Sequence, residues 1–169
     1  QFCICIAYIE NNYPVFGIIY IPSTKEFFYA IQGNGSYLLG EDGVKVKLPL
    51  IKPISDRIFL STTIRKSILK ILENDFPDSE KVFMSSAVKF SKVAEGNGHL
   101  SIRLGPTYEW DTAAGQCILE ESGSLFLDKN LNRFSYGKEE NLLNGPFFVI
   151  NGNLNDYKKT IGQCLSLTE

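Results

Sequence analysis

The sequence predicts a mixed α/β fold (α+β) in which an antiparallel sheet is followed by an α/β layer. Five short apolar segments, separated by turn residues, occupy the first fifty positions. Beyond residues 49–53, segments with strand and helix patterns alternate, which is typical of helices packed on a sheet. We therefore expect two subregions, residues 1–50 and 51–169, that meet near positions 49–56.

The first subregion is expected to form an antiparallel meander. Its apolar segments are rich in β-branched and aromatic residues, and turn-forming residues such as Gly33-Asn34-Gly35 separate them. Because these connections are short, consecutive strands should pair as hairpins. The expected strands are Phe2–Ile9, Pro14–Ile21, Glu26–Ile31, Ser36–Leu39 and Val44–Leu48.

The second subregion should alternate strands with amphipathic helices. Apolar residues recur there at helical spacing, as at Ile64, Ile68, Ile71 and Leu72. The expected strands are Arg57–Ser61, Lys81–Ser85, His99–Leu104, Ser124–Leu127 and Phe147–Asn151. The expected helices cover about 64–73, 87–95, 105–123 and 155–165.

The helix expected between Gly105 and Gly123 has the clearest pattern. An apolar stripe at i, i+3, i+4, i+7 and i+8 should face a core; its members are Trp110, Ala113, Ala114, Cys117 and Ile118. Gly115 lies inside this helix, where glycine costs about 1 kcal/mol relative to alanine. That cost suggests that another part of the chain packs very close to Gly115.

Asp111 is the first candidate for chemistry, because it falls in or just before the first helical turn. Backbone N–H groups without intrahelical partners give this end of a helix a partial positive charge, which favours phosphate. A carboxylate beside bound phosphate can hold a divalent cation. The alternative is that Asp111 only caps the helix.

Small hydroxyl residues mark three expected transitions from a strand to a helix. They are Ser61-Thr62-Thr63, Ser85-Ser86, and Thr107 with Asp111. Ligands gather at such transitions in α/β layers, although each serine alone can equally be a helix cap. Lys89 lies one turn into its helix, where a cation is unfavourable unless an anion is bound. A solvated surface lysine is the alternative.

A resemblance to a known family covers nearly the whole chain. Glu-Trp-Asp-Thr-Ala-Ala-Gly at 109–115 resembles the second signature of the inositol monophosphatase superfamily of Mg²⁺-dependent, Li⁺-sensitive phosphatases. The segments 85–90, 93–96 and 103–107 look more narrowly like its 3'(2'),5'-bisphosphate nucleotidase branch, of the CysQ type. The resemblance implies a layered sugar-phosphatase-like fold and makes Asp111 a Mg²⁺ ligand.

The resemblance also implies substrate-binding roles. Ser85 and Lys89 match positions around the retained phosphate of the nucleotide, Ser61 matches a hydroxyl residue nearby, and Arg103 would belong to the wall of the site. Two departures count against nucleotide affinity: Ile64 stands where the branch often has His, and Ser85 stands where it usually has Gly. Beyond the metal ligand Asp111, we expect no catalytic residue in this chain.

The remaining metal ligands of the family lie outside this sequence. They come from a Gly-Glu-Glu segment and an Asp-Pro-Leu/Ile-Asp-Gly-Thr segment, and neither occurs here. The sequence opens on Gln1 and enters an apolar run at once, so we interpret it as a C-terminal portion in which residues 1–50 end the metal-site subdomain. We read Glu95, Glu109, Glu120 and Glu121 as surface acids rather than substitute ligands.

Charge and composition disfavour several other classes of protein. A net charge of −2 offers no general attraction for nucleic acid or an anionic membrane, and no apolar run reaches the roughly 18 residues of a membrane helix. The four cysteines form no CxxC motif, and the only histidine, His99, has no clustered partner. These features disfavour zinc, a redox dithiol and a role for His99, and they favour a cytoplasmic protein with reduced thiols.

The leading hypothesis is a Mg²⁺-dependent phosphatase of sulfur assimilation. By the resemblance, it removes the 3'-phosphate of adenosine 3',5'-bisphosphate to give AMP and phosphate, and this portion alone is inactive. The alternatives are inositol monophosphate or fructose bisphosphate hydrolysis, or a non-catalytic remnant that binds an anion or a partner chain through an exposed sheet edge. A homodimer, or association with the missing N-terminal half, is the expected partnership.

Overall fold

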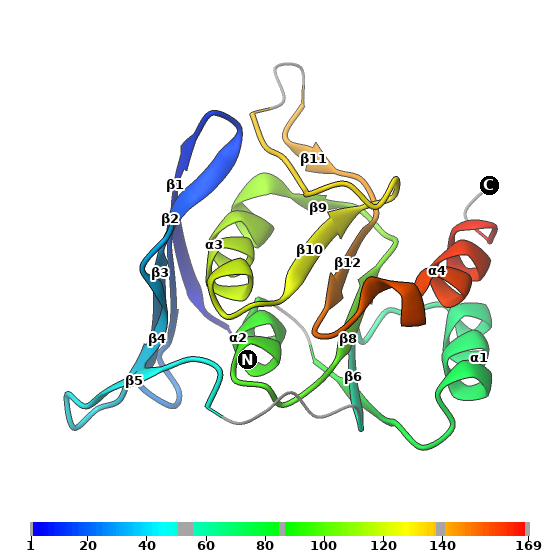
Figure 1. Cartoon of the computed structure of the whole chain (residues 1–169), viewed down its shortest axis with the longest axis horizontal. Coiled ribbons are helices and arrows are strands. Elements are labelled where there is room, and N and C mark those ends of the chain that lie inside the picture. The colour runs from blue at the N-terminus through cyan, green and yellow to red at the C-terminus, as the bar shows by residue number, and fades with distance from the viewer. Residues whose placement is uncertain (1, 51–55, 85–86, 138–140, 168–169) are drawn as a thin grey trace.

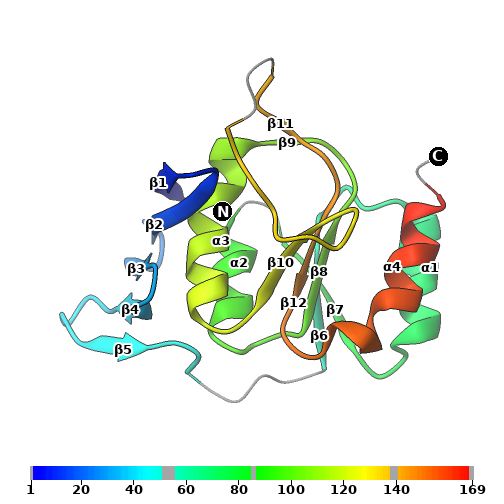
Figure 2. The same cartoon turned by 45° about the horizontal axis from the view of Figure 1, so that its top comes forward.

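Four layers stack in the computed structural model of the chain, which describes residues 2–50, 56–84, 87–137 and 141–167. A first sheet is followed by two helices, a second sheet and two more helices (Figure 1). The helices between the sheets are α2 (Val88–Ala94) and α3 (Glu109–Glu121). On the far side of the second sheet, α1 (Lys66–Asp75) and α4 (Lys158–Leu165) lie side by side (Figure 2). The expected layered α/β fold is thus confirmed.

The first sheet is the expected meander. Its strands follow chain order, and each pairs antiparallel with the next. They are β1 (Ile4–Glu10), β2 (Tyr13–Ile21), β3 (Glu26–Ile31), β4 (Gly35–Leu39) and β5 (Lys45–Lys47).

The second sheet is mixed and has the order β10-β12-β8-β6-β7. Within it, β6 runs parallel to β7 and β8, whereas β12 runs antiparallel to β8 and β10. The bounds are β6 (Arg57–Leu60), β7 (Glu80–Phe83), β8 (Leu100–Arg103), β10 (Leu125–Asp128) and β12 (Phe147–Ile150). Two short elements that we did not expect, β9 (Thr107–Tyr108) and β11 (Leu143–Asn144), form a separate ladder. The expected last helix is divided into a 3₁₀ turn, Leu154–Asp156, and α4.

Helix α3 packs on the inner face of the first sheet. A Cβ added to Gly17 of β2 would lie 2.6 Å from the carbonyl oxygen of Ala114, so glycine is what allows the strand and the helix to approach. The buried cluster on this face also contains Ile19, Phe28 and Ile118. This cluster joins residues from both sides of the boundary that we expected near positions 49–56. Positions 51–55 of that boundary lie outside the described residues. The division into two subdomains therefore stays a prediction.

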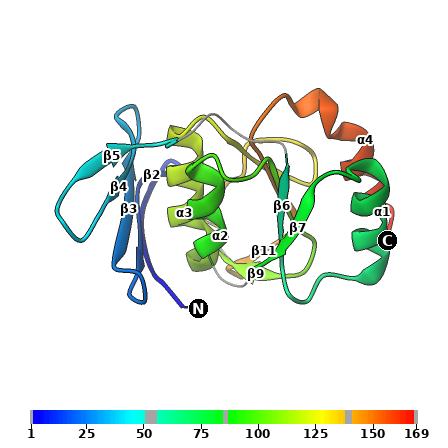
Figure 3. The same cartoon turned by 90° about the horizontal axis from the view of Figure 1, so that it is seen from below.

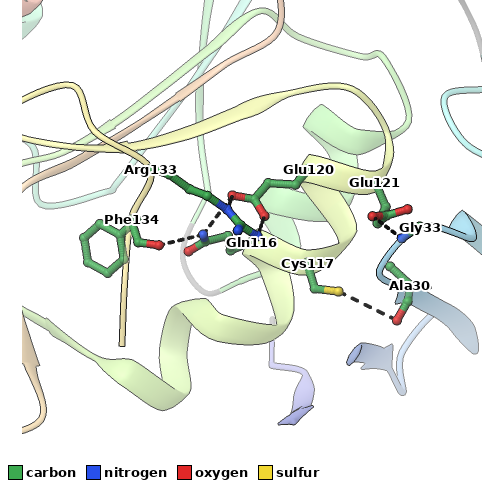
Figure 4. Close-up of polar contacts among 8 residues, drawn as sticks. All are labelled: Ala30, Gly33, Gln116, Cys117, Glu120, Glu121, Arg133 and Phe134. Carbon is green, nitrogen blue, oxygen red and sulfur yellow. Dashed lines mark hydrogen bonds and ion pairs between the residues drawn. The ribbon is translucent and has the colours of Figure 1, made fainter. Parts of the chain in front are cut away.

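Polar contacts fix the second half of α3 on both sides (Figure 4). Glu121 accepts hydrogen bonds from the backbone N–H groups of Gly33 (2.8 Å) and Gly35 (2.7 Å), and so holds the turn between β3 and β4. On the opposite side, Gln116 Nε2 donates to the carbonyl oxygen of Phe134 at 2.8 Å. The orientation of α3 between the sheets is therefore determined by hydrogen bonds as well as by packing.

The apolar stripe of α3 is confirmed except at Trp110. Ala113, Ala114, Cys117 and Ile118 are buried, but Trp110 is 58% exposed. Because the helix begins at Glu109, Trp110 lies in its first turn, where it stacks on Tyr108 with ring centroids 4.4 Å apart. The expectation that Trp110 faces the core was therefore wrong.

The outer face of the first sheet is apolar, and no helix or strand of the described chain covers it (Figures 1 and 3). The register places on this face Ile4, Ile6, Tyr8, Phe16, Ile18, Tyr20, Phe27, Tyr29, Ile31, Tyr37 and Leu39, with Lys45 and Lys47 on β5 at the far edge. Ile4, Ile6 and Tyr8 of the edge strand β1 are 51%, 55% and 60% exposed. Antiparallel sheets that face water normally carry polar residues there, so this face has the character of an interface.

Candidate functional site

The first three transitions from a strand to a helix in the second subregion converge on one cavity of about 570 Å³. Because β6 and β8 are parallel neighbours, the segments that follow them emerge at the same edge of the sheet. The start of α2 and the inward-facing side chains of β1 complete the wall. The lining residues are Cys3, Cys5, Ser61, Thr62, Thr63, Ala87, Lys89, Phe90, Arg103, Thr107, Trp110, Asp111, Thr112 and Phe147.

Lys89 is a buried cation without a counterion. Its side chain lines the cavity although the residue is only 6% exposed, and it makes no hydrogen bond or ion pair with any residue that the structure describes. The pKa of Lys89 is lowered to about 8, chiefly by burial and also by the charge of Arg103, while the charge of Asp111 opposes the shift. A buried ammonium that faces a cavity without a partner is suited to bind an anion.

Arg103 is oriented by neutral oxygen atoms. One guanidinium nitrogen donates to Ser61 Oγ at 2.7 Å, and the other two donate to the carbonyl oxygens of Gly105 and Pro106, both at 3.2 Å. In the described part of the chain it forms no ion pair with a carboxylate. The cavity therefore receives a second positive charge that no carboxylate of the described residues pairs with.

Asp111 is the third residue of α3 and lies on the same cavity. Its Oδ2 accepts a hydrogen bond from the backbone N–H of Tyr108 at 2.9 Å, so the carboxylate does cap the helix. Its Oδ1 has no hydrogen-bond partner among the described residues. Asp111 can thus cap the helix and still offer one oxygen to a cation.

Ser61 supports Arg103 and the loop after β6. Its Oγ lies 3.0 Å from Thr63 Oγ1 and accepts from the backbone N–H of Thr63 at 3.3 Å, in addition to the bond from Arg103. The structure thus brings Ser61, Lys89, Arg103 and Asp111 together. Ser85, the remaining expected site residue, lies outside the described residues.

The described residues do not form a complete Mg²⁺ site. Asp111 is the one carboxylate among the residues that line the cavity, and no three His, Cys, Asp or Glu side chains in the described ranges converge where they could hold a metal ion. Asp111 fits one ligand position, because Mg²⁺ prefers oxygen ligands. The other ligands would have to come from outside these residues.

Two of the four acids expected at the surface are buried. Glu95 is 4% exposed and bonds to Lys92 and Asn97, and Glu109 is 7% exposed and accepts from the backbone N–H of Gly137. Both lie outside the lining of the cavity. Sequence periodicity missed their burial because it does not show the contacts to Asn97 and Gly137, which lie outside the helices; Lys92 alone lies on a helix, one turn before Glu95.

His99 is a structural residue away from the cavity. It is 2% exposed, its Nδ1 lies 2.9 Å from the hydroxyl of Tyr157, and its Nε2 lies 3.1 Å from Ser79 Oγ. Burial lowers its pKa to about 4. No role for His99 at the site was expected, and it does not line the cavity.

Sequence reasoning missed several residues of the cavity wall, among them Cys3, Cys5 and Trp110. Cys5 lies on β1 and Cys3 just before it, and their sulfur atoms lie 3.8 Å apart. No local signal, however, connects these cysteines to a helix about a hundred positions later. Trp110 was missed because helical periodicity was extended into the first turn.

The chain resembles phosphatases of one family in both sequence and structure. A sequence model described as the inositol monophosphatase family matches residues 1–158. The 3'(2'),5'-bisphosphate nucleotidase CysQ of Aggregatibacter actinomycetemcomitans is 34% identical over 154 residues, which are 89% of this chain and 56% of that protein. CysQ of Haemophilus influenzae is 34% identical over 156 residues, 90% of this chain and 57% of that protein.

A solved structure of the same family is also similar to this chain. The crystal structure of CysQ from Bacteroides thetaiotaomicron, a bacterial member of the inositol monophosphatase family, superposes with a TM-score of 0.74 at 28% identity. The match covers 89% of this chain and 63% of that one. The chain therefore spans a little over half the length of the curated relatives that it matches. In the described part of the chain, no helix is long and apolar enough to cross a bilayer.

Proposed function

The chain belongs to the inositol monophosphatase family, and we propose that it forms the substrate-holding part of a 3'(2'),5'-bisphosphate nucleotidase. The reaction would remove the 3'-phosphate of adenosine 3',5'-bisphosphate and give AMP and phosphate. The proposal names this substrate because the curated relatives at 34% identity are nucleotidases of that kind. We place the reaction in the cytoplasm, in keeping with four cysteines that are all free thiols.

The observation that carries the proposal is the uncompensated pair of cations at the cavity. Lys89 has no hydrogen-bond or ion-pair partner among the described residues, although its ammonium group lies over the ring of Phe90, and Arg103 is held by neutral oxygens. The burial of Lys89 lowers its pKa to about 8, so at pH 7 it is still mostly protonated. A doubly charged phosphate would satisfy both side chains, which makes a phosphorylated ligand the simplest occupant.

We assign the retained 5'-phosphate to Lys89 and Arg103. Ser61 supports this role indirectly, because its hydroxyl fixes the guanidinium of Arg103. Ser85 is proposed to contribute as well, as the family resemblance implies. The phosphate to be removed would then lie near Asp111, at the positive end of α3.

Asp111 would hold Mg²⁺ through Oδ1. When bound, the metal supplies activation of the attacking water and stabilisation of the leaving oxygen. Because the described residues lack the other ligands, we propose that further polypeptide completes the site and that this chain alone binds the nucleotide without hydrolysing it at an enzyme's rate.

The outer face of the first sheet supports association with such polypeptide. It is apolar over β1 to β4, with Lys45 and Lys47 of β5 at its far edge, and Ile4, Ile6 and Tyr8 leave more than half of their surface exposed. About two fifths of each curated relative lies beyond its match to this chain. We propose that either polypeptide corresponding to that part or a second copy of the chain covers this face.

Titration calorimetry with adenosine 3',5'-bisphosphate tests the proposal. Lys89→Met should weaken binding by about tenfold or more, because the ligand loses a desolvated charge-assisted contact. Lys92→Met is the matched control: Lys92 lies on the same helix but pairs with Glu26 and Glu95, so its loss should leave the affinity unchanged. Equal affinity of the wild type and Lys89→Met would rule out the assignment.

A substrate panel separates the alternatives. The wild-type chain should bind adenosine 3',5'-bisphosphate more tightly than inositol 1-phosphate or fructose 1,6-bisphosphate. In an assembly that hydrolyses phosphate esters, Asp111→Ala should abolish turnover, whereas full activity would remove Asp111 from the metal site. Rapid phosphate release by the isolated chain with Mg²⁺ would contradict the proposed need for further polypeptide.

A further inference from the structure

The start of α3 is held in place by one asparagine. Asn144 on β11 pairs with Thr107 of β9, the residue that precedes the helix by two positions. The side chain of Asn144 is buried, with 4% of the residue exposed. The short β9–β11 ladder thus carries a buried polar group to the end of the helix that contains Asp111.

The two N–H groups of the Asn144 side chain face three oxygen atoms around the first turn, so one N–H is shared between two acceptors. Its Nδ2 lies 2.9 Å from the carbonyl oxygen of Tyr108, 2.9 Å from Thr112 Oγ1 and 3.1 Å from Thr107 Oγ1. A carbonyl oxygen can only accept, which assigns this side-chain atom as the amide nitrogen. Asn144 therefore joins the residue before the helix to the helix itself.

The hydroxyl of Thr112 is fully used in this network. It donates to the carbonyl oxygen of Glu109 at 3.2 Å and accepts from both Asn144 and the hydroxyl of Tyr136, the latter at 3.2 Å. A hydroxyl has one donor and two acceptor positions, so all three are occupied. Buried networks that are fully satisfied rigidify their surroundings.

Tyr108 connects the network to Asp111. Asn144 holds the carbonyl oxygen of Tyr108, and the N–H of Tyr108 donates to Asp111 Oδ2 at 2.9 Å. The next N–H, that of Glu109, donates to the carbonyl oxygen of Leu142, which precedes β11. Asp111 and Asn144 thus bond to the two peptide groups that flank the Cα of Tyr108, so the backbone of Tyr108 links the carboxylate to Asn144.

We propose that Asn144 is a positioning residue, which sets the first turn of α3 so that Asp111, Thr107 and Thr112 face the cavity. The effect of Asn144 on a reaction rests on the proposed function. Its effect on the position of Asp111 is independent of that function. Asparagine is required because aspartate of nearly the same shape has no amide donor for the three oxygens.

Amide hydrogen exchange of Asn144→Asp, measured by NMR without ligand, tests the positioning. After correction for global stability, the Tyr108 amide should exchange about tenfold faster or more, because its acceptor Asp111 is no longer held. Thr112→Val is a milder variant that removes one acceptor of the network and should give a smaller change in the same direction.

Asn151→Asp is the matched control. Asn151 is also buried and donates through Nδ2 to a carbonyl oxygen, that of Val93 at 3.3 Å, but it lies at the end of β12 and outside the cavity lining. It should lower global stability without specific exchange at Tyr108. The proposal would be overturned if, in both Asn144→Asp and Thr112→Val, the exchange rate of the Tyr108 amide changed only as much as the loss of global stability explains.

A second measurement separates this inference from the proposed function. The affinity for adenosine 3',5'-bisphosphate should fall by about fivefold or more in Asn144→Asp and stay unchanged in Asn151→Asp. If the wild type binds no nucleotide, the proposed function fails, while the exchange data still decide whether Asn144 holds Asp111. If Asn144→Asp binds as tightly as the wild type, the positioning role is refuted.

Discussion

Gly115 of α3 lies directly against the ring of Phe90 of α2. A Cβ added to Gly115 would be 2.2 Å from Cδ2 and 2.8 Å from Cγ of Phe90. In an open helix, Gly→Ala stabilises by about 1 kcal/mol. Here we expect Gly115→Ala to lower the free energy of unfolding by about 1–3 kcal/mol, because a buried ring must move. Urea denaturation measures the change.

Gly162 of α4 supplies the control, because an added Cβ there meets no atom within 4 Å. Gly162→Ala should raise the free energy of unfolding by about 1 kcal/mol through helix propensity alone. Opposite signs for the two substitutions are the expected result. A stabilising Gly115→Ala would mean that α2 and α3 do not approach as closely as described.

Gly115 and Trp110 show which features of the fold can be predicted from local sequence patterns and which cannot. Glycine inside a strong helical pattern predicts a close approach, and the approach is found, but the partner Phe90 has no local signal. Trp110 fits the apolar stripe and yet is exposed, because periodicity does not mark the residue at which a helix begins. Local patterns thus predicted the elements, whereas contacts between distant segments came only from the structure.

The candidate site likewise contains residues that the sequence predicted and one whose role only the structure shows. Asp111, Lys89, Ser61 and Arg103 were expected from helix ends and from the family resemblance, and they do line one cavity or support its wall. The role of Asn144 was not expected. Its ladder partner lies 37 positions away on a two-residue strand, which is too short to leave a period in the sequence.

Lys89 should make stability rise with pH in the alkaline range. Burial lowers its pKa from 10.5 to about 8, so between these values the unfolded chain binds a proton that the folded chain does not. The free energy of unfolding should therefore rise across this window by up to about 3 kcal/mol. Urea denaturation between pH 7.5 and about 10.5 measures it, and Lys89→Met should remove the rise.

Binding should show the opposite trend. An anion needs Lys89 in its charged form, so the affinity for adenosine 3',5'-bisphosphate should fall as the pH rises above about 8. Lys89→Met should bind weakly at every pH. An affinity that is independent of pH in the wild type would contradict a protonated Lys89 at the phosphate.

His99 should make the protein sensitive to acid. Burial lowers its pKa from 6.5 to about 4, with the charge of Asp56 opposing the shift and that of Lys81 adding to it. The neutral ring therefore contributes stability that is fully present above about pH 6.5 and is lost as the pH falls towards 4, by up to about 3 kcal/mol. Because His99 is the only histidine, its ring signals in NMR report this pKa without ambiguity.

His99→Gln tests the assignment of the acid effect. The variant should be less stable at neutral pH, because the contacts to Tyr157 and Ser79 are altered, and its stability should vary less between pH 4 and 6.5. A titration of His99 near 6.5 in the folded protein would show instead that the ring is accessible to water.

The same substitution should have little effect on stability at Ile6 and a large one at Ile19, because the two residues lie on opposite faces of the first sheet. Ile6 is 55% exposed on the outer face, whereas Ile19 is fully buried on the inner face against α3. Ile6→Lys should leave the free energy of unfolding within about 0.5 kcal/mol of the wild type, and Ile19→Lys should cost more than about 3 kcal/mol.

The same substitution at Ile6 should change how the protein associates. If the outer face is an interface, the wild-type chain should self-associate in sedimentation experiments and bind a hydrophobic dye, because the face is apolar and the edge of β1 is unpaired. Ile6→Lys should reduce both effects, since a charge at the centre of the edge strand opposes burial. A wild-type chain that stays monomeric and binds no dye would remove the argument that further polypeptide covers this face.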